Sequence, residues 1–163
     1  MTIILKNKET LIYKDFSFKC CVGKKGTTKY KIEGDNKTPK GTYSLDNLYF
    51  RKDKNLKPIT KLKCIPIQKK MGWCNDIRNK KYNKIIKISK KIGHEKMFRK
   101  DYKYDFVIPI NYNTSNTKIG KGSAIFIHLT KNFKGTAGCI ALKKKDLLIL
   151  IKLINQKTKI KIL

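Results

Sequence analysis

The sequence predicts a mainly β domain with one or two helices, formed by residues 1–163 as one unit. Short apolar segments rich in Ile, Thr, Tyr and Phe recur between turn signals, which is typical of strands. Only one segment has the periodicity of an amphipathic helix. No repeat, linker or shift in composition divides the chain, and 163 residues are enough for one hydrophobic core.

The first third of the chain predicts an opening meander followed by a longer strand. Gly23 and Gly26 bound a turn after the meander, and glycines and a proline mark a tight connection over residues 34–41. We expect Asp35 to brace this connection rather than to take part in chemistry. The expected meander strands are residues 2–5, 10–13 and 16–22, and residues 42–50 form the strand after the connection.

The middle of the chain is less regular. Residues 64–68 are extended, and the only tryptophan, Trp73, either lines a groove or closes the edge of the core. Residues 93–99 fit a helical turn, in which a structural role for His94 is favoured over a catalytic one. Residues 104–110 form an apolar strand that ends near Pro109.

The C-terminal part contains the best helix candidate, Lys144–Asn155. Four apolar residues follow the i, i+1, i+4, i+7 spacing of a buried stripe, namely Leu147, Leu148, Ile151 and Ile154. After the helix, Ile and Lys alternate over Thr158–Leu163, which predicts a closing strand with one buried face.

The net charge is +29, with 37 lysines against 3 arginines. We favour a coding bias toward Lys, Ile and Asn, with lysines at solvated positions spread along the chain. The alternative is an electrostatic footprint for an anionic polymer. A specific nucleic-acid reader would use more arginine for phosphates and base edges, so no specific nucleic-acid partner is expected.

The five cysteines lack the regular Cys/His pairs of a zinc site, so no metal is expected. A disulfide between Cys64 and Cys74 stays open, although buried free thiols are favoured for the four cysteines outside residues 123–142. No transmembrane segment is expected, and residues 1–8 are too short and polar for the apolar part of a secretion signal.

The segment Ser123–Leu142, which contains His128 and Cys139, carries the most chemical information. In strands, Ala124, Phe126 and His128 share one face, and Cys139 and Ala141 share a face in the same way, with Ile140 and Leu142 on the other. Ten residues lie between His128 and Cys139, enough for a hairpin that brings imidazole and thiol together. This pair fits a nucleophile and its base, although the residues alone fit a buried core thiol and a structural histidine equally well.

Several motifs in order resemble the YkuD-type L,D-transpeptidase catalytic domain, in its compact proteobacterial-type branch. The likeness extends over nearly the whole chain, but Thr136-Ala137-Gly138-Cys139 replaces the Ser-His-Gly-Cys of the commoner branch, and Gly135 replaces the usual proline of the compact branch. The motifs are Glu33-Gly-Asp-x-x-Thr-Pro-x-Gly41, Gly72-Trp-Cys-x-Asp76, His94-Glu95, Tyr104-Asp105, Tyr112-Asn113, Gly120-x-Gly-Ser-Ala-Ile-Phe-x-His128 and Thr136-x-Gly-Cys-Ile-x-Leu142.

The resemblance implies a β-rich sandwich or barrel-like fold and a cysteine-dependent transferase that crosslinks peptidoglycan stem peptides in bacterial cell-wall remodelling and cell shape. Cys139 would form a thioester, His128 would act as base, and no cofactor would be needed. The N–H groups of Gly138 and Cys139 would face the oxyanion, and Thr136 would orient the loop or contact substrate. The likeness also suggests substrate-binding roles for Trp73, His94, Tyr112 and Asn113.

Two alternatives stay open. The same site serves a hydrolase of stem peptides, an L,D-carboxypeptidase or endopeptidase, if water replaces the amine acceptor. A polyanion-binding module without enzymatic activity is the alternative from another class. The family implies the cell envelope or periplasm, whereas the absence of a visible leader leaves the cytoplasm open. We expect a monomer.

Overall fold

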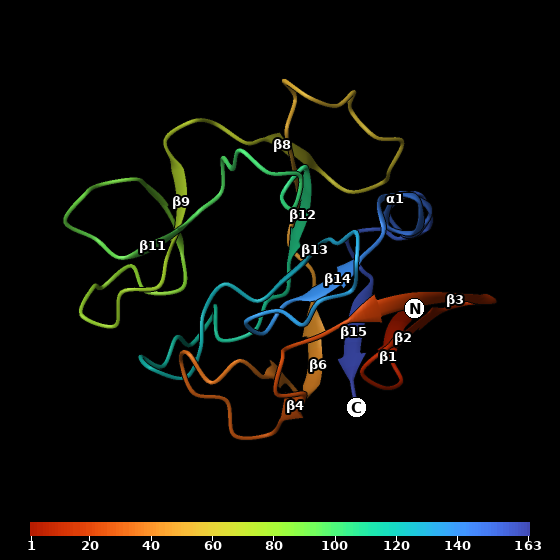
Figure 1. Ribbon diagram of the computed structural model, residues 1–163, viewed down its shortest axis with the longest axis horizontal. Helices are drawn as coiled ribbons and strands as arrows, with labels where there is room; N and C mark the ends of the chain where they lie inside the picture. Colours follow the sequence, from red (N-terminus) through yellow and green to blue (C-terminus); the bar gives the residue numbers. More distant parts are fainter.

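The computed structural model describes all residues from 1 to 163, and its largest element is a strongly curled ten-stranded sheet (Figure 1). The predicted opening meander is confirmed, since the first three strands pair antiparallel in chain order. In the order in which they lie side by side, the strands are β6 (Gly41–Ser44), β15 (Lys159–Ile162), β1 (Thr2–Leu5), β2 (Thr10–Tyr13), β3 (Phe16–Cys21), β14 (Ile140–Leu142), β13 (Phe126–Leu129), β12 (Phe106–Pro109), β7 (Leu48–Phe50) and β8 (Cys64–Pro66).

The alternation of Ile and Lys at the C-terminus produces the predicted closing strand, β15. Ile160 and Ile162 are buried while the lysines between them are exposed, because successive side chains point to opposite faces. β15 pairs parallel with β1 and antiparallel with β6. It therefore joins the N-terminal meander to the edge of the sheet.

The curl of the sheet is fixed where β6 ends. Leu45 bridges to Ile110, the N–H of Asp46 donates to the carbonyl of Pro109 at 2.9 Å, and the N–H of Asn111 donates to the carbonyl of Ser44 at 2.9 Å. These contacts tie one edge of the sheet to the strands near its other edge. They enclose the main hydrophobic core and confirm the mainly β, barrel-like fold class.

Residues 42–50 do not form the one strand that the sequence predicts. The turn at Leu45–Asn47 separates β6 from β7, which pairs with β12 in a different part of the sheet. The two halves of the predicted strand therefore pair with different strands, β6 with β15 and β7 with β12. The break follows from the contacts of Leu45 and Asp46 with the end of β12.

Two smaller sheets flank the large one. The predicted helical turn over residues 93–99 is wrong, because its central part, His94–Lys96, is paired antiparallel with Gly72–Cys74. Hydrogen bonding to a neighbouring strand thus overrides a weak local preference. The smaller sheets contain β10 (Ile85–Lys87), β9 (Met71–Cys74) and β11 (His94–Lys96) in one, and β4 (Thr27–Thr28) and β5 (Thr38–Pro39) in the other.

The predicted C-terminal helix is confirmed as α1 (Lys144–Leu153). Leu147, Leu150 and Ile151 form its buried face, whereas Leu148, predicted to be in the stripe, is only partly buried. Ile154, just after the helix, is fully buried as expected. No helix of the chain has both the length and the apolar character needed to cross a membrane.

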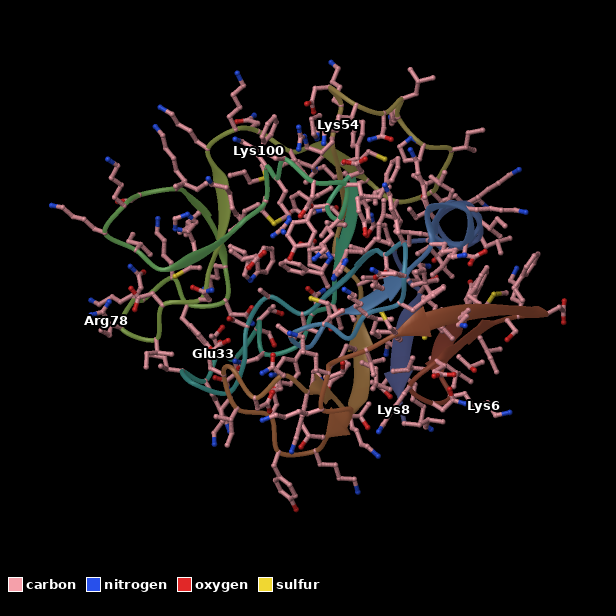
Figure 2. All side chains as sticks on the ribbon, viewed as in Figure 1. Lys6, Lys8, Glu33, Lys54, Arg78 and Lys100 are labelled. Atoms are coloured by element: carbon pink, nitrogen blue, oxygen red, sulfur yellow. The ribbon has the colours of Figure 1, made fainter.

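Lysine side chains cover the outside of the molecule (Figure 2). Lys31 is the one buried lysine. The others keep their ammonium groups at or near solvent, as the interpretation of solvated lysines expects. All five cysteines are free thiols, so Cys64 and Cys74 do not form a disulfide in this structure.

Candidate active site

Cys139 and His128 lie on one face of two neighbouring strands. β14 begins directly after Cys139 and pairs parallel with β13, with Ile127 opposite Ile140 and His128 opposite Ala141. In this register Cys139 lies opposite Phe126, two residues along the strand from His128. The side chains of Cys139 and His128 therefore share the face away from the buried Ile127 and Ile140.

The predicted hairpin between these residues is wrong, because the two strands run parallel. Residues 130–139 cross back from the end of β13 to its beginning before β14 starts. β14 then lies between β13 and β3, and it runs antiparallel to β3. The pairing with β3 fixes the direction of β14, which the local sequence does not reveal.

The Cys139 thiol is held by two backbone groups. Its S–H donates to the carbonyl oxygen of Ala124 at 3.3 Å, and Sγ accepts a hydrogen bond from the N–H of Phe126 at 3.3 Å. The residue is 8% exposed. Burial raises the pKa of the thiol to about 12, and the N–H of Phe126 only partly opposes this effect. The Cys139 thiol is therefore neutral at physiological pH.

His128 is oriented by the backbone. Its Nδ1 lies 3.0 Å from the carbonyl oxygen of Leu129, so Nδ1 carries the proton and Nε2 is the free basic atom. Burial lowers the pKa of the imidazole to about 4. The ring is therefore neutral at physiological pH and able to accept a proton.

The loop before Cys139 is fastened from both sides. Thr136 Oγ1 donates to the carbonyl of Cys139 at 2.6 Å and accepts from the N–H of Gly138 at 3.1 Å. The backbone N–H of Thr136 donates to Val22 at 2.9 Å, and its carbonyl accepts from Lys24 at 2.8 Å. Thr136 thus ties the loop to the backbone on both sides.

The two predicted oxyanion donors differ in this structure. The N–H of Gly138 is already bonded to Thr136, whereas the N–H of Cys139 has no hydrogen-bond partner. Gly138 has φ of +146° and passes so close to Lys37 that a Cβ atom would lie 2.9 Å from its carbonyl oxygen. Gly138 therefore shapes the turn, and the free donor beside Sγ is Cys139 itself.

A cavity of about 470 Å³ opens beside the pair, and both Cys139 and His128 line it. Most of its charged lining is basic. The lining also includes Thr136 and Tyr104 from the neighbouring segments. Its charged residues are Lys24, Glu95, Arg99, Lys103 and Lys134.

Tyr104, Glu95 and Arg99 form part of this cavity wall, although the predicted site does not include them. The ring of Tyr104 meets the ring of His128 edge-on, with centroids 5.4 Å apart. The Tyr104 hydroxyl donates to Glu95 at 3.0 Å, and Arg99 pairs with the same carboxylate oxygen at 3.1 Å. Glu95 and Tyr104 could have been found from the motifs His94-Glu95 and Tyr104-Asp105. Because side chains alternate along a strand, one residue of each motif is expected to face the site.

None of the four residues suggested as substrate-binding lines the cavity at Cys139. Trp73 is buried and packs edge-on against Phe126 with ring centroids 5.1 Å apart. His94 Nδ1 lies 2.7 Å from the carbonyl of Ile92 in a local turn. Tyr112 donates through its hydroxyl to Lys121, and Asn113 braces its loop through Lys118 and Gly122.

Three of these four residues instead converge on Asn83, which supports the thiol indirectly. Asn83 Oδ1 accepts from the indole of Trp73 at 2.9 Å and from the N–H of Ala124 at 3.0 Å. Its Nδ2 donates to the carbonyls of Tyr112 and Asn113 at 2.9 and 2.7 Å. Because the carbonyl of Ala124 accepts the hydrogen bond from the thiol, these residues form a scaffold behind Cys139.

Asp35 is a loop brace, as the sequence predicts. Its carboxylate accepts from Lys31 and from the N–H groups of Ile32 and Lys37, at 3.0 and 2.9 Å for the two N–H donors. These hydrogen bonds hold the pKa of Asp35 below its usual range, although burial alone would raise it. The ionised carboxylate thereby fixes the loop that approaches Gly138.

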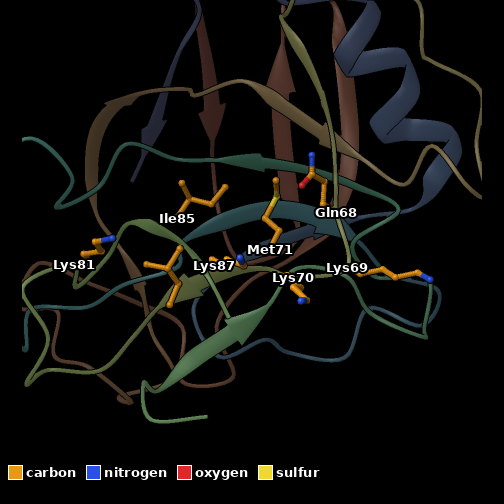
Figure 3. A pocket seen from close by; sticks show the side chains of 8 residues that line it. Gln68, Lys69, Lys70, Met71, Lys81, Ile85 and Lys87 are labelled. Atoms are coloured by element: carbon orange, nitrogen blue, oxygen red, sulfur yellow. The ribbon is translucent and has the colours of Figure 1, made fainter. Parts of the chain in front are cut away.

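The largest cavity, about 730 Å³, is a separate one on the small sheet of β9 and β10 (Figure 3). Its lining holds neither Cys139 nor His128, and it contains no acidic residue. The lining residues are Gln68, Lys69, Lys70, Met71, Lys81, Ile85, Ile86 and Lys87. Size therefore does not identify the candidate active site, whereas the cysteine and the histidine do.

The fold and the site together define a curled β domain with a buried cysteine–histidine pair beside a cationic cavity. The family model of the YkuD L,D-transpeptidase catalytic domain matches residues 1–162, so the chain belongs to this family. A comparison with curated protein sequences gave no match.

Solved structures share the fold. Bd1075 from Bdellovibrio bacteriovorus is 17% identical with a TM-score of 0.54, and the match covers 99% of this chain and 47% of that one. The helical cell shape determining protein Pgp2 from Campylobacter jejuni is 21% identical with a TM-score of 0.51, over 99% of this chain and 46% of that one. The chain thus spans slightly less than half the length of either protein.

Proposed function

We propose that this chain is an L,D-transpeptidase that acts on peptidoglycan stem peptides through a thioester on Cys139. The observation that carries the proposal is the placement of Cys139 and His128 on one face of adjacent strands, lining one cavity. The family of the chain supplies the class of reaction. The substrate is part of the bacterial cell envelope, where we expect the enzyme to act.

In the first step Sγ attacks the carbonyl carbon of an L-residue that is joined to a D-residue. Both Cys139 and His128 are neutral at rest, because burial raises the pKa of one and lowers that of the other. The proton therefore leaves Sγ for Nε2 of His128 as the C–S bond forms, and it passes on to the amine of the departing D-residue. The N–H of Cys139 would stabilise the oxyanion.

In the second step an amine of a neighbouring stem attacks the thioester. The C–N bond forms, the C–S bond breaks, and the thiol regains its proton through His128. Water in place of the amine would yield hydrolysis at the same site. The basic lining of the cavity at Cys139 and His128 supports the choice of substrate, because stem peptides carry carboxylates, the one on a C-terminal D-residue included.

Product analysis of muropeptides tests the proposal. Purified protein and its Cys139→Ser variant are incubated with isolated sacculi and with monomeric tetrapeptide muropeptides, and products are identified by mass spectrometry. We expect dimers and an acyl-enzyme with the wild type, and a loss of at least about 10³-fold with Cys139→Ser. Serine keeps the shape of the side chain, so a matched melting curve serves as the folding control.

Two other outcomes would change the assignment. Shortened stems without dimers would make the chain a hydrolase of stem peptides. Unchanged muropeptides with folded wild-type protein would exclude wall chemistry on these substrates. A salt titration of polyanion binding, which should be indifferent to Cys139→Ser, would then test the binding alternative.

A further inference from the structure

Cys139 lies where two cavities meet. The larger is the cationic cavity described above, and the smaller has a volume of about 130 Å³. Cys139, Glu95, Tyr104 and Ala137 line both. A group bound in either cavity can therefore approach the same sulfur, and the thiol has two distinct approaches.

The charged lining of the two cavities is opposite in character. The larger cavity has four basic side chains and one acidic one, whereas the smaller has the carboxylates of Glu33 and Glu95 and one basic side chain, Lys31. Lys31 is buried, and its ammonium group is already bonded to Asp35 and to the carbonyl of Ile32. Its charge is therefore compensated within the protein.

This acidic character is contrary to the composition of the chain, which has 40 basic and only 11 acidic residues. An average surface of this protein would present basic groups to a ligand. The smaller cavity instead has two carboxylates in the lining that it shares with the nucleophile. Arg99 pairs with Glu95, whereas no basic side chain pairs with Glu33. Such a lining favours a cationic ligand and disfavours an anionic one.

Both carboxylates keep one oxygen available. Glu33 is labelled in Figure 2. Its Oε2 accepts hydrogen bonds from the hydroxyls of Tyr82 and Ser123, the second at 2.6 Å, and its Oε1 has no protein partner. Oε1 of Glu95 accepts from Tyr104 and Arg99, while its Oε2 has none. Each side chain is thus held in position through one oxygen and can bind a donor through the other.

We infer that the smaller cavity is the site of the amine acceptor, with Glu33 and Glu95 binding the ammonium group of the attacking stem. This inference rests on the proposed function. It assigns the larger, cationic cavity to the donor stem and separates the two substrates by charge.

The chemistry balances without a further reactant. The bound ammonium first releases one proton to solvent, which leaves a neutral amine beside the thioester. The amine nitrogen attacks the carbonyl carbon, the C–S bond breaks, and the second proton passes from nitrogen to Sγ through His128. A carboxylate pair beside the thiol concentrates the amine against water, so it favours crosslinking over hydrolysis.

The test is the ratio of dimers to hydrolysed monomers formed from monomeric tetrapeptide muropeptides. For Glu33→Gln we expect this ratio to fall about tenfold, the size of a lost hydrogen bond to a charged group, because glutamine keeps an acceptor for Tyr82 and Ser123 but lacks the charge. The rate of acyl-enzyme formation, followed by the mass of the intact protein, should change less than about threefold, since the acylation step does not use Glu33.

Glu9→Gln is the matched control, because Glu9 is exposed and lines neither cavity, so the ratio should stay as in the wild type. Glu95→Gln is the second variant and should lower the ratio in the same direction, which keeps the test decisive if Glu33→Gln does not fold. An unchanged ratio in folded Glu33→Gln and Glu95→Gln would overturn the acceptor site and leave the transpeptidase standing.

Two outcomes with the wild type also decide the inference. Hydrolysis without any dimer, at high concentrations of acceptor, would overturn the acceptor site while cysteine chemistry remains. No donor turnover and no acyl-enzyme at all would overturn the proposed function itself. The mass of the intact protein distinguishes these cases, because an acyl group on Cys139 appears in the first and not in the second.

Discussion

Asn83 Oδ1 accepts a hydrogen bond of 3.0 Å from the N–H of Ala124, the residue whose carbonyl holds the thiol of Cys139. Asn83 is 2% exposed and has φ of +58°, and Ala124 has φ of +53°. Both residues therefore adopt the left-handed region, which is unfavourable for residues other than glycine unless the surroundings impose it. The position of the nucleophile depends on this pair of turns.

Replacement of Asn83 by alanine should destabilise the protein and displace the thiol. The change leaves four groups without their partner, namely the indole of Trp73, the N–H of Ala124 and the carbonyls of Tyr112 and Asn113. We expect a loss of about 3 kcal/mol or more in the free energy of unfolding, measured by denaturant titration. Asn79→Ala, at a partly buried turn position where the side chain accepts only from the N–H of Lys81, is the control and should cost less than about 1 kcal/mol.

The hydroxyl of Thr136 should affect catalysis more than substrate binding. Thr136→Val keeps the shape but removes the acceptor for Gly138 and the donor to the carbonyl of Cys139. We expect kcat to fall about 10- to 100-fold with KM nearly unchanged, because the loop no longer holds the N–H of Cys139 in place. Thr136→Ser should restore most of the rate, and equal rates for the valine and serine variants would contradict the role.

The pH dependence of kcat/KM should reflect the buried imidazole. His128 must be neutral to accept the thiol proton, and burial lowers its pKa from the ordinary 6.5 to about 4. Protonation then inactivates the enzyme only as the pH falls toward 4, so activity at pH 5.5 should stay close to that at pH 7. Initial rates between pH 4 and pH 8, with circular dichroism to verify the fold, provide the measurement. An acid limb centred near pH 6.5 would contradict it.

The sequence predicts the placement of His128 and Cys139 on one face, because alternation along a strand is a local property. It does not predict that their strands run parallel, since this depends on the pairing of β14 with β3, more than a hundred residues earlier. The curl of the sheet has the same origin, because Leu45 and Ile110 are distant in the chain. Local patterns thus define the elements, and long-range pairing decides how they face one another.

The sequence does not predict the scaffold role of Trp73 either. An aromatic residue next to a glycine fits a groove or a core edge, and only the contact with Asn83 and Phe126 decides for the core. The helix boundaries and most of its buried face were readable, because the 3.6-residue period is local. Glu33 was visible as part of a motif, but its place beside Cys139 depends on three separate segments of the chain.

Gly138 is the position where the smallest substitution should have the largest effect. Its φ of +146° is rarely adopted by residues with a side chain, and an added Cβ would lie 2.9 Å from the carbonyl oxygen of Lys37 and 3.2 Å from Cδ1 of Ile125. For Gly138→Ala we expect a loss of about 1–3 kcal/mol in the free energy of unfolding, measured by denaturant titration. We also expect at least about 100-fold lower kcat/KM in the muropeptide assay, because the neighbouring Cys139 must shift.

Gly120→Ala is the matched control, since Gly120 also has a positive φ, +77°, but open space around it. It should cost less stability than Gly138→Ala, because only the positive φ opposes the alanine, and it should leave the rate nearly unchanged. Equal rates for the two variants would show that the turn at Gly138 does not position the thiol.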